Sequence, residues 1–154
     1  MSQQRYHCGM DLQQFFPYRL AVLADAVSRA IAGVYSERYD LGRDEWRVLA
    51  ALVAGPMRTA DVIAHTTLDK MQVSRAVARL EAAGLLERDA DPEDRRARVQ
   101  RLTATGRALF RRIAPLAQAR EAFLLDALDD AERHVLDRAI DKLRERARLL
   151  ERTG

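Results

Sequence analysis

A short segment near the middle of the chain concentrates side chains that bind nucleic acids. No carboxylate occurs between Lys70 and Arg79, and the polar residues of this stretch are cations, an amide and a hydroxyl. They are Lys70, Gln72, Ser74, Arg75 and Arg79. Lysine and arginine bind phosphate oxygens, while arginine, glutamine and serine also hydrogen-bond to base edges. The segment therefore predicts DNA recognition. Taken alone, an ordinary surface helix with solvated arginines would have the same composition.

A second basic group follows a segment rich in turn-forming residues. The turn formers run from Asp89 to Asp94, and the cations that come after them are Arg95, Arg96 and Arg98. Such a tip is exposed, and its arginines can reach phosphates or a minor groove. We interpret Arg96 as a DNA-contacting residue. We interpret Asp94 as a brace, because a carboxylate can hold a nearby guanidinium in a bidentate contact.

The element expected to carry the first group is a helix with clear start and stop residues. Asp69 can cap the first turn, and Gln72, three residues later, can reach back to complete a capping box. Apolar residues then recur at helical spacing: Val73, Val77 and Leu80. Gly84 is expected to end the helix. One face of this helix therefore points into a core and leaves the basic face outside.

After Gly84 the hydrophobic period changes to that of strands. Residues 85–88 and 97–102 are predicted to form a hairpin around the basic tip. The second strand buries either the face with Val99 or the face with Gln100 and Leu102. A helix followed by a basic hairpin is the arrangement of a winged helix-turn-helix, with one element in the major groove and the other near the minor groove.

Helices are expected on both sides of this unit. Their predicted ranges are 12–35, 44–52, a start at Arg58 or Thr59, a start at Thr103 or Thr105 running to about 128 with an interruption at Pro115, and a start at Asp129 or Asp130 running to about 150. In the second helix Trp46, Leu49 and either Leu52 or Val53 should point inward. The predicted fold class is α+β and mainly α-helical.

The first and last helices carry apolar stripes with little chain to bury them against. The stripe of the first helix includes Leu20, Leu23, Val27 and Ile31, and that of the last includes Leu136, Ile140, Leu143 and Leu150. A twofold homodimer would bury both stripes and present two reading heads to a palindromic DNA site. The alternative is that the stripes close the core of a monomer.

Charge is distributed unevenly along the chain. The segment from Arg58 to Arg112 has 12 Lys or Arg against 8 Asp or Glu, whereas the remainder has 14 against 15. Only Lys70 and Lys142 are lysines; arginine suits phosphate and guanine, but a high-GC genome gives the same bias. One cysteine, no membrane-spanning run and no signal peptide predict a cytoplasmic protein that does not act at a membrane.

Several motifs together resemble the MarR family of bacterial transcriptional regulators. They are Leu68-Asp69-Lys70, Val73-Ser74-Arg75, Arg79-Leu80-Glu81, Gly84-Leu85-Leu86, Asp91-Pro92, Asp94-Arg95-Arg96 and Leu102-Thr103-Ala104-Thr105-Gly106-Arg107. The resemblance covers about Phe16 to Leu150. It implies a single domain over 1–154, with a winged helix-turn-helix core at 42–104 and dimerisation helices at 11–38 and 105–151. It also implies a double-stranded DNA operator as partner.

The resemblance further implies a small, often aromatic, anionic effector. The segments 15–23 and 43–47 are similar to a branch associated with hydroxycinnamate catabolism, sometimes sensing coenzyme A thioesters. The candidate effector-binding residues are Phe16, Tyr18, Arg19, Tyr39, Trp46 and His65. The aromatic rings can stack on a ligand ring, and Arg19 can bind a carboxylate or phosphate. The alternative is that the aromatics belong to the core and Arg19 to a structural ion pair.

Other function classes have less support in the sequence. An enzyme would need a nucleophile, a paired acid and base, or a phosphate loop, and none is recognisable, so no enzyme and no cofactor are expected. The histidines and Cys8 are too scattered to predict a metal site. Redox sensing through Cys8 is an alternative to ligand sensing. Nonspecific architectural DNA binding is another, because phosphate contacts would use the same arginines.

Overall fold

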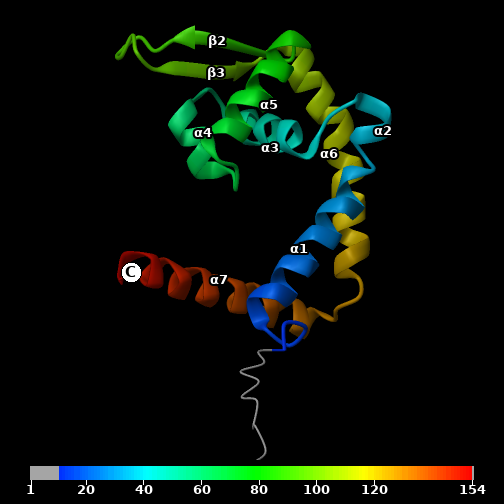
Figure 1. Cartoon of the computed structure of the whole chain (residues 1–154). Coiled ribbons are helices and arrows are strands. Elements are labelled where there is room, and N and C mark those ends of the chain that lie inside the picture. Colours follow the sequence, from blue (N-terminus) through cyan, green and yellow to red (C-terminus); the bar gives the residue numbers. More distant parts are fainter. Residues whose placement is uncertain (1–10, 154) are drawn as a thin grey trace, which may run out of the picture. The chain divides into compact units, whose positions relative to one another are not determined.

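The structure is a computed structural model that describes residues 11–153. Its elements, in chain order, are α1 (Phe16–Ala32), α2 (Ser36–Tyr39), α3 (Arg43–Ala51), the 3-10 turn η1 (Leu52–Ala54), β1 (Met57–Arg58), α4 (Thr59–His65), α5 (Lys70–Ala82), β2 (Leu86–Ala90), β3 (Arg98–Leu102), α6 (Ala104–Leu125) and α7 (Asp130–Thr153) (Figure 1). The chain forms two compact units, one up to Ala114 and one from Pro115 onward. The division falls inside α6.

The core of the first unit is built around α3, α4 and α5, with the hairpin β2–β3 beside them (Figure 1). Its completely buried apolar side chains include Val48, Leu49, Val62, Val73 and Ile113. Leu52 is buried and Val53 is exposed, so Leu52 is the one that points inward. This is the predicted winged helix-turn-helix, and the predicted fold class is confirmed.

The predicted ends of α5 are confirmed in detail. Asp69 Oδ1 accepts the backbone N–H of Gln72 at 2.8 Å, and Gln72 Oε1 accepts that of Asp69 at 2.9 Å, which is a complete capping box. At the other end Gly84 has φ +71°, and its N–H donates to the carbonyl of Glu81. Only glycine adopts this left-handed conformation without cost, so the helix ends where the sequence predicts.

The sheet has three antiparallel strands in the order β1-β3-β2. β1 was not expected from the sequence, which predicted strands only at residues 85–88 and 97–102. In the register of the sheet Met57 pairs with Gln100, and Leu86 pairs with Leu102. Gln100 and Leu102 are buried, so they form the inward face of β3. The buried Gln100 Nε2 donates to Thr59 Oγ1 at 2.8 Å, which ties the sheet to the start of α4.

A compact junction joins the end of α5 to the start of α6. The hydroxyl of Thr103 donates to the carbonyl of Gly84 at 2.7 Å and accepts the N–H of Gly106 at 3.0 Å. The Thr103 N–H donates to the carbonyl of Leu85. A Cβ at Gly106 would lie 2.1 Å from the Leu85 oxygen, so only glycine permits this approach. Thr103, rather than Thr105, is therefore the cap of α6.

The long helices depart from the prediction in two places. The single helix predicted over 12–35 is present as α1, but it begins at Phe16 and ends at Ala32, because the chain leaves the helix at Gly33 to Tyr35. α6 continues through Pro115, and the predicted interruption is wrong. Proline removes one backbone hydrogen bond, which a 22-residue helix can lose without ending. In the second unit Asp129 and Glu132 form the capping box that opens α7.

Both α1 and α7 have apolar side chains that the described chain leaves exposed, and neither helix contains a buried residue. Of the helices in residues 11–153, none has the length and apolar character needed to cross a membrane.

Candidate nucleic-acid interface and ligand cavities

The exposed face of α5 presents the residues predicted to contact DNA. Lys70, Ser74 and Arg75 are exposed, as is Met71 between them. Gln72 is half-buried because its Oε1 is engaged in the capping box. Its amide NH2 group has no partner within residues 11–153 and remains able to donate.

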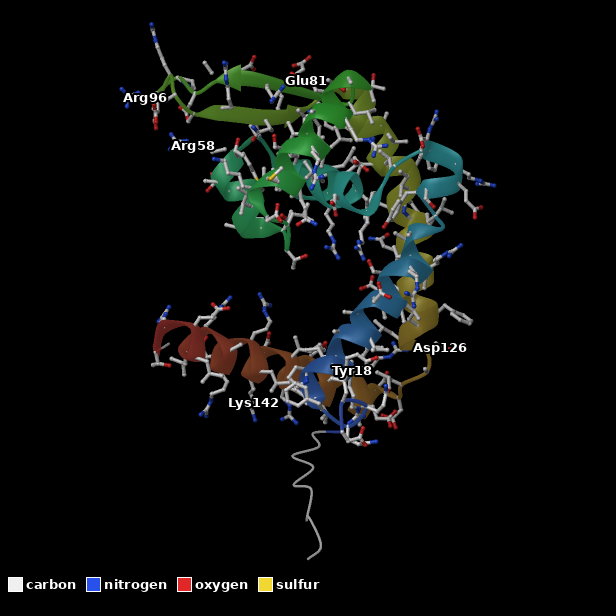
Figure 2. The ribbon with its side chains drawn as sticks, viewed as in Figure 1. Tyr18, Arg58, Glu81, Arg96, Asp126 and Lys142 are labelled. Atoms are coloured by element: carbon white, nitrogen blue, oxygen red, sulfur yellow. The ribbon has the colours of Figure 1, made fainter. Side chains whose placement is uncertain are left out.

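The wing tip is a turn that displays two arginines. The N–H of Ala97 donates to the carbonyl of Asp94 at 2.9 Å, which places Arg95 and Arg96 at the centre of the turn. Asp94 Oδ1 accepts the N–H of Arg96 at 3.0 Å, as in an Asx-turn. Figure 2 shows Arg96 at the far end of the hairpin, directed away from the sheet. Arg98 is exposed on β3 behind the tip.

The expected side-chain brace is formed by a different aspartate. The carboxylate of Asp94 holds a backbone N–H, whereas Asp91 holds a guanidinium through a hydrogen bond from Arg58 Nε. Asp91 is only 4% exposed and also accepts the N–H of Glu93 at 2.8 Å. Arg58 Nη2 reaches Glu93 Oε2 at 3.2 Å. The prediction that Asp94 pairs with an arginine is therefore wrong for this structure, because the turn uses its oxygen locally.

The hydrogen bond between Arg58 and Asp91, at the root of the wing, changes the pKa of both residues. Hydrogen bonds from the Glu93 N–H and from Arg58 lower the pKa of Asp91, and the bond to Asp91 raises the pKa of Arg58. Both groups therefore stay charged at neutral pH. Neither Arg58 nor Asp91 was predicted to form an ion pair, although Asp91-Pro92 is one of the motifs that carry the family resemblance.

Cations of the helix and hairpin divide into two sets. Of the cations on α5, on β2 and β3 and in the turn between these strands, those that form no ion pair in the described chain are Lys70, Arg75, Arg95, Arg96 and Arg98. The arginines farther back are neutralised by carboxylates: Arg58 by Asp91, Arg79 by Glu45, Arg88 by Glu81 and Arg101 by Asp89. Uncompensated positive charge is thus concentrated where a phosphate backbone would lie.

The six candidate effector residues do not form one site. Tyr18 and Arg19 line a cavity of about 330 Å³ on α1, together with Val22 and Leu23. Tyr39 lines another cavity, of about 410 Å³, beside α3 and α5. Phe16 lines none of the cavities described here and is 49% exposed.

Trp46 and His65 are brought together at a third cavity, of about 320 Å³. Arg47 and Thr67 also line it, and Arg47 Nη1 donates to Thr67 Oγ1 at 2.8 Å. His65 Nδ1 lies 2.8 Å from the carbonyl of Asp61 and must donate to it, which leaves Nε2 as an acceptor in the neutral ring. Arg47 was not among the predicted effector residues, although it lies next to Trp46.

The ring of Trp46 has a structural role that was left open as an alternative. It stacks on Tyr35 on one side and on Phe110 on the other, with ring centroids 5.4 Å apart in both contacts. Both faces of the indole are therefore covered by core residues. A ligand in this cavity would meet only its edge, and the expected stacking of an effector ring on Trp46 is corrected accordingly.

Metal or thiol chemistry finds no support in the described part of the chain. No three His, Cys, Asp or Glu side chains within residues 11–153 are grouped to hold a metal ion. Cys8 lies outside the described residues.

Comparison with known proteins links this geometry to DNA-binding regulators. The family model described as MarR family matches residues 39–97, which includes α3 to the wing tip. The HTH-type transcriptional repressor NicR of Pseudomonas putida is 33% identical over 79 residues, covering 51% of this chain and 50% of that protein. The chain thus spans half the length of this curated relative.

Solved structures match over most of the chain. BpsR of Bordetella bronchiseptica, whose DNA binding is regulated by 6-hydroxynicotinic acid, matches with a TM-score of 0.79 and 26% identity, over 88% of this chain and 96% of that one. The PcaV transcriptional regulator of Streptomyces coelicolor, solved with its natural ligand, matches with a TM-score of 0.78 and 26% identity, over 90% and 98% of the two chains.

Proposed function

We propose that the chain is a transcriptional repressor of the MarR family that binds a palindromic operator as a homodimer and is released by a small aromatic acid. The observation that carries this proposal is the set of unpaired cations on α5 and the wing. Lys70, Gln72, Ser74 and Arg75 would lie in the major groove, and Arg95, Arg96 and Arg98 would follow the backbone and minor groove beside it.

The exposed apolar faces of α1 and α7 support the homodimer. On α1 they include Leu20 and Leu23, which are 52% and 59% exposed, and on α7 Ile140 and Leu143, which are 44% and 48% exposed. Exposure of these apolar side chains to water does not stabilise a single subunit. A twofold dimer would cover them and present two reading heads to the two halves of an operator.

The cavity at Trp46, Arg47, His65 and Thr67 supports an aromatic acid as effector. Its volume of about 320 Å³ suits a single-ring molecule. Arg47 can bind a carboxylate, and His65 Nε2 can accept a hydrogen bond from a ring hydroxyl. A hydroxylated aromatic acid such as a hydroxycinnamate meets both requirements. The coenzyme A part of a thioester would have to extend outside this volume.

Release from DNA requires that the ligand distinguish two conformations. An acid that binds equally well to the DNA-bound and free forms would not change the affinity for the operator. The cavity touches the end of α4 and the turn that precedes α5. A ligand that moves this turn would change the position of the reading helix, which supplies the necessary difference.

Titration of the protein's own promoter fragment tests the proposal. Affinity for it should exceed that for a scrambled duplex by about a thousandfold or more at fixed salt, and a hydroxycinnamate should reduce it. Equal affinity for both duplexes would identify an architectural DNA-binding protein instead. Insensitivity to aromatic acids, with release by peroxide that is lost in Cys8→Ser, would identify a redox regulator.

A further inference from the structure

The helix α5 exposes one large apolar side chain among its polar and charged ones. Met71 is 67% exposed, more than any other large apolar side chain described in the first unit. It is also not among the residues that pack against the core of that unit. Because single apolar residues are common on protein surfaces, the position of Met71 on the helix, rather than its exposure alone, indicates what it can bind.

Met71 lies at the centre of the exposed face of α5. Ser74, Arg75 and Ala78 follow it at positions i+3, i+4 and i+7, so these four exposed residues form one stripe along the helix. The buried residues of α5 occupy the opposite side, and they are Val73, Ala76, Val77 and Leu80. Met71 therefore points away from the core, on the same stripe as Ser74 and Arg75, which are predicted to contact base edges.

The chemistry of Met71 and its neighbours fits one base in the major groove. Lys70 and Arg75 form no ion pair in the described chain, so this end of the helix is positively charged and suits DNA. The thioether of Met71 has no hydrogen-bond donor and only a weak acceptor, so it cannot read a base by hydrogen bonding. Thymine presents an apolar group in the major groove, its 5-methyl, and apolar side chains contact this group.

We propose that Met71 selects a thymine in each half of the operator by packing against the 5-methyl group. The inference rests on the proposed binding of α5 in the major groove, and it adds a base preference to that binding. Residues four apart on a helix have their Cβ atoms about 5–6 Å apart, and successive bases of one DNA strand are about 3.4 Å apart. The thymine is therefore expected within about two base pairs of the base that Arg75 contacts.

Uracil substitution tests the contact, because uracil differs from thymine only in lacking the methyl group. Titrations at fixed salt compare the promoter fragment, the same duplex with uracil in place of thymine, and a scrambled duplex. Loss of one buried methyl contact should weaken wild-type binding about fourfold in each half-site, and hence about tenfold or more for a dimer on both halves. Uracil placed at one position at a time should locate the effect next to the base that Arg75→Ala no longer distinguishes.

Variants assign the effect to Met71. Met71→Gln, which has a similar length but a polar end, should bind the thymine and uracil duplexes equally, whereas Met71→Leu should retain most of the preference. Val53→Ala is the control, because it removes an exposed apolar side chain that lies outside α5 and should leave the thymine preference unchanged. Any effect of uracil on the duplex itself is the same for every variant and cancels in this comparison.

The outcomes separate this proposal from operator recognition itself. A wild-type protein that prefers the promoter to the scrambled duplex, but binds the thymine and uracil forms equally, would overturn the thymine contact alone. An undiminished thymine preference in Met71→Gln would also overturn it. Equal affinity for the promoter and the scrambled duplex would overturn operator recognition, and the thymine contact with it.

Discussion

Arg58 on β1 donates its Nε–H to the buried carboxylate of Asp91 at the root of the wing. Figure 2 shows Arg58 beneath the basic hairpin that ends at Arg96. The bond joins a two-residue strand to the loop that follows β2. Because Asp91 also accepts the N–H of Glu93, one carboxylate fixes both the start of the wing loop and its connection to the sheet.

Acid should open this wing root. The lowered pKa of Asp91 means that its contribution is complete above the ordinary value of about 3.9 and is lost as the pH falls through the lower folded-state value. In an NMR titration the amide of Glu93 should therefore report a midpoint below 3.9, and Asp91→Asn should abolish that transition. A midpoint at or above the ordinary pKa would show that the carboxylate is not held.

Arg75 should be a DNA-reading residue. Its guanidinium is exposed on α5 and has no ion-pair partner in the described chain. Arg75→Ala should weaken operator binding by about 1–3 kcal/mol, the value of one good bidentate base contact. Arg101→Ala is the matched control, because Arg101 is already paired with Asp89 and should change affinity little. Wild-type affinity of Arg75→Ala in a fixed-salt titration would exclude this role.

Asp94 should support DNA binding although it is acidic. Its carboxylate holds the N–H of Arg96 and so shapes the turn that displays that arginine. Asp94→Ala should weaken operator binding by about 0.5–1.5 kcal/mol, the typical value of one hydrogen bond. Arg96→Ala provides the reference, with a loss in the slope of log affinity against log salt of about one per subunit. Tighter operator binding by Asp94→Ala would mean that only its charge matters.

The reading helix could be predicted well because the residues that define it are close together in the sequence. Asp69 and Gln72 are one helical turn apart, and Gly84 follows the last buried leucine, so the local pattern contains both ends. Pairing of β1 with β3 could not be predicted in this way. A strand of two residues has no period of its own, and its partner lies about forty residues later in the chain.

The wing brace and the ligand cavities show the same limit. Arg58 and Asp91 are separated by 33 positions, whereas Asp94 precedes two arginines directly, so the local sequence favoured the wrong aspartate. Trp46 was predicted to point inward and was also a candidate for stacking on an effector ring. The sequence could not decide between the two, because neither Tyr35 nor Phe110, which cover the indole, is near enough in sequence to indicate a stack. Contacts that depend on tertiary structure leave little trace in local composition.

Dimerisation should depend on the apolar face of α7. Ile140 is 44% exposed in the single chain, and burial against a partner would remove it from water. Ile140→Glu should therefore shift the protein toward monomer in sedimentation at micromolar concentration. Arg138→Glu, which places the same side chain on the opposite side of the helix, should leave the dimer intact. A monomeric wild type would contradict the homodimer directly.

Thr103 should stabilise the junction between α5 and α6. Thr103→Val keeps the shape of the side chain but removes the hydrogen bonds to Gly84 and from Gly106. We expect a loss of about 1–2 kcal/mol in the free energy of unfolding. Thr105→Val is the control, because the exposed Thr105 makes no side-chain hydrogen bond in the described structure. Equal stability of the two variants in denaturant melts would refute this role.

The location of the Thr103 junction affects how such a protein can diversify. The junction uses the carbonyls of Gly84 and Leu85 at the end of α5, whereas the base-reading candidates Gln72 and Arg75 lie near its beginning. Substitutions at the beginning can therefore change the preferred operator without disturbing the attachment of α6. Gly106, in contrast, tolerates no side chain. The preferred operator sequence can therefore change during evolution, whereas the junction that attaches α6 to the reading helix must be retained.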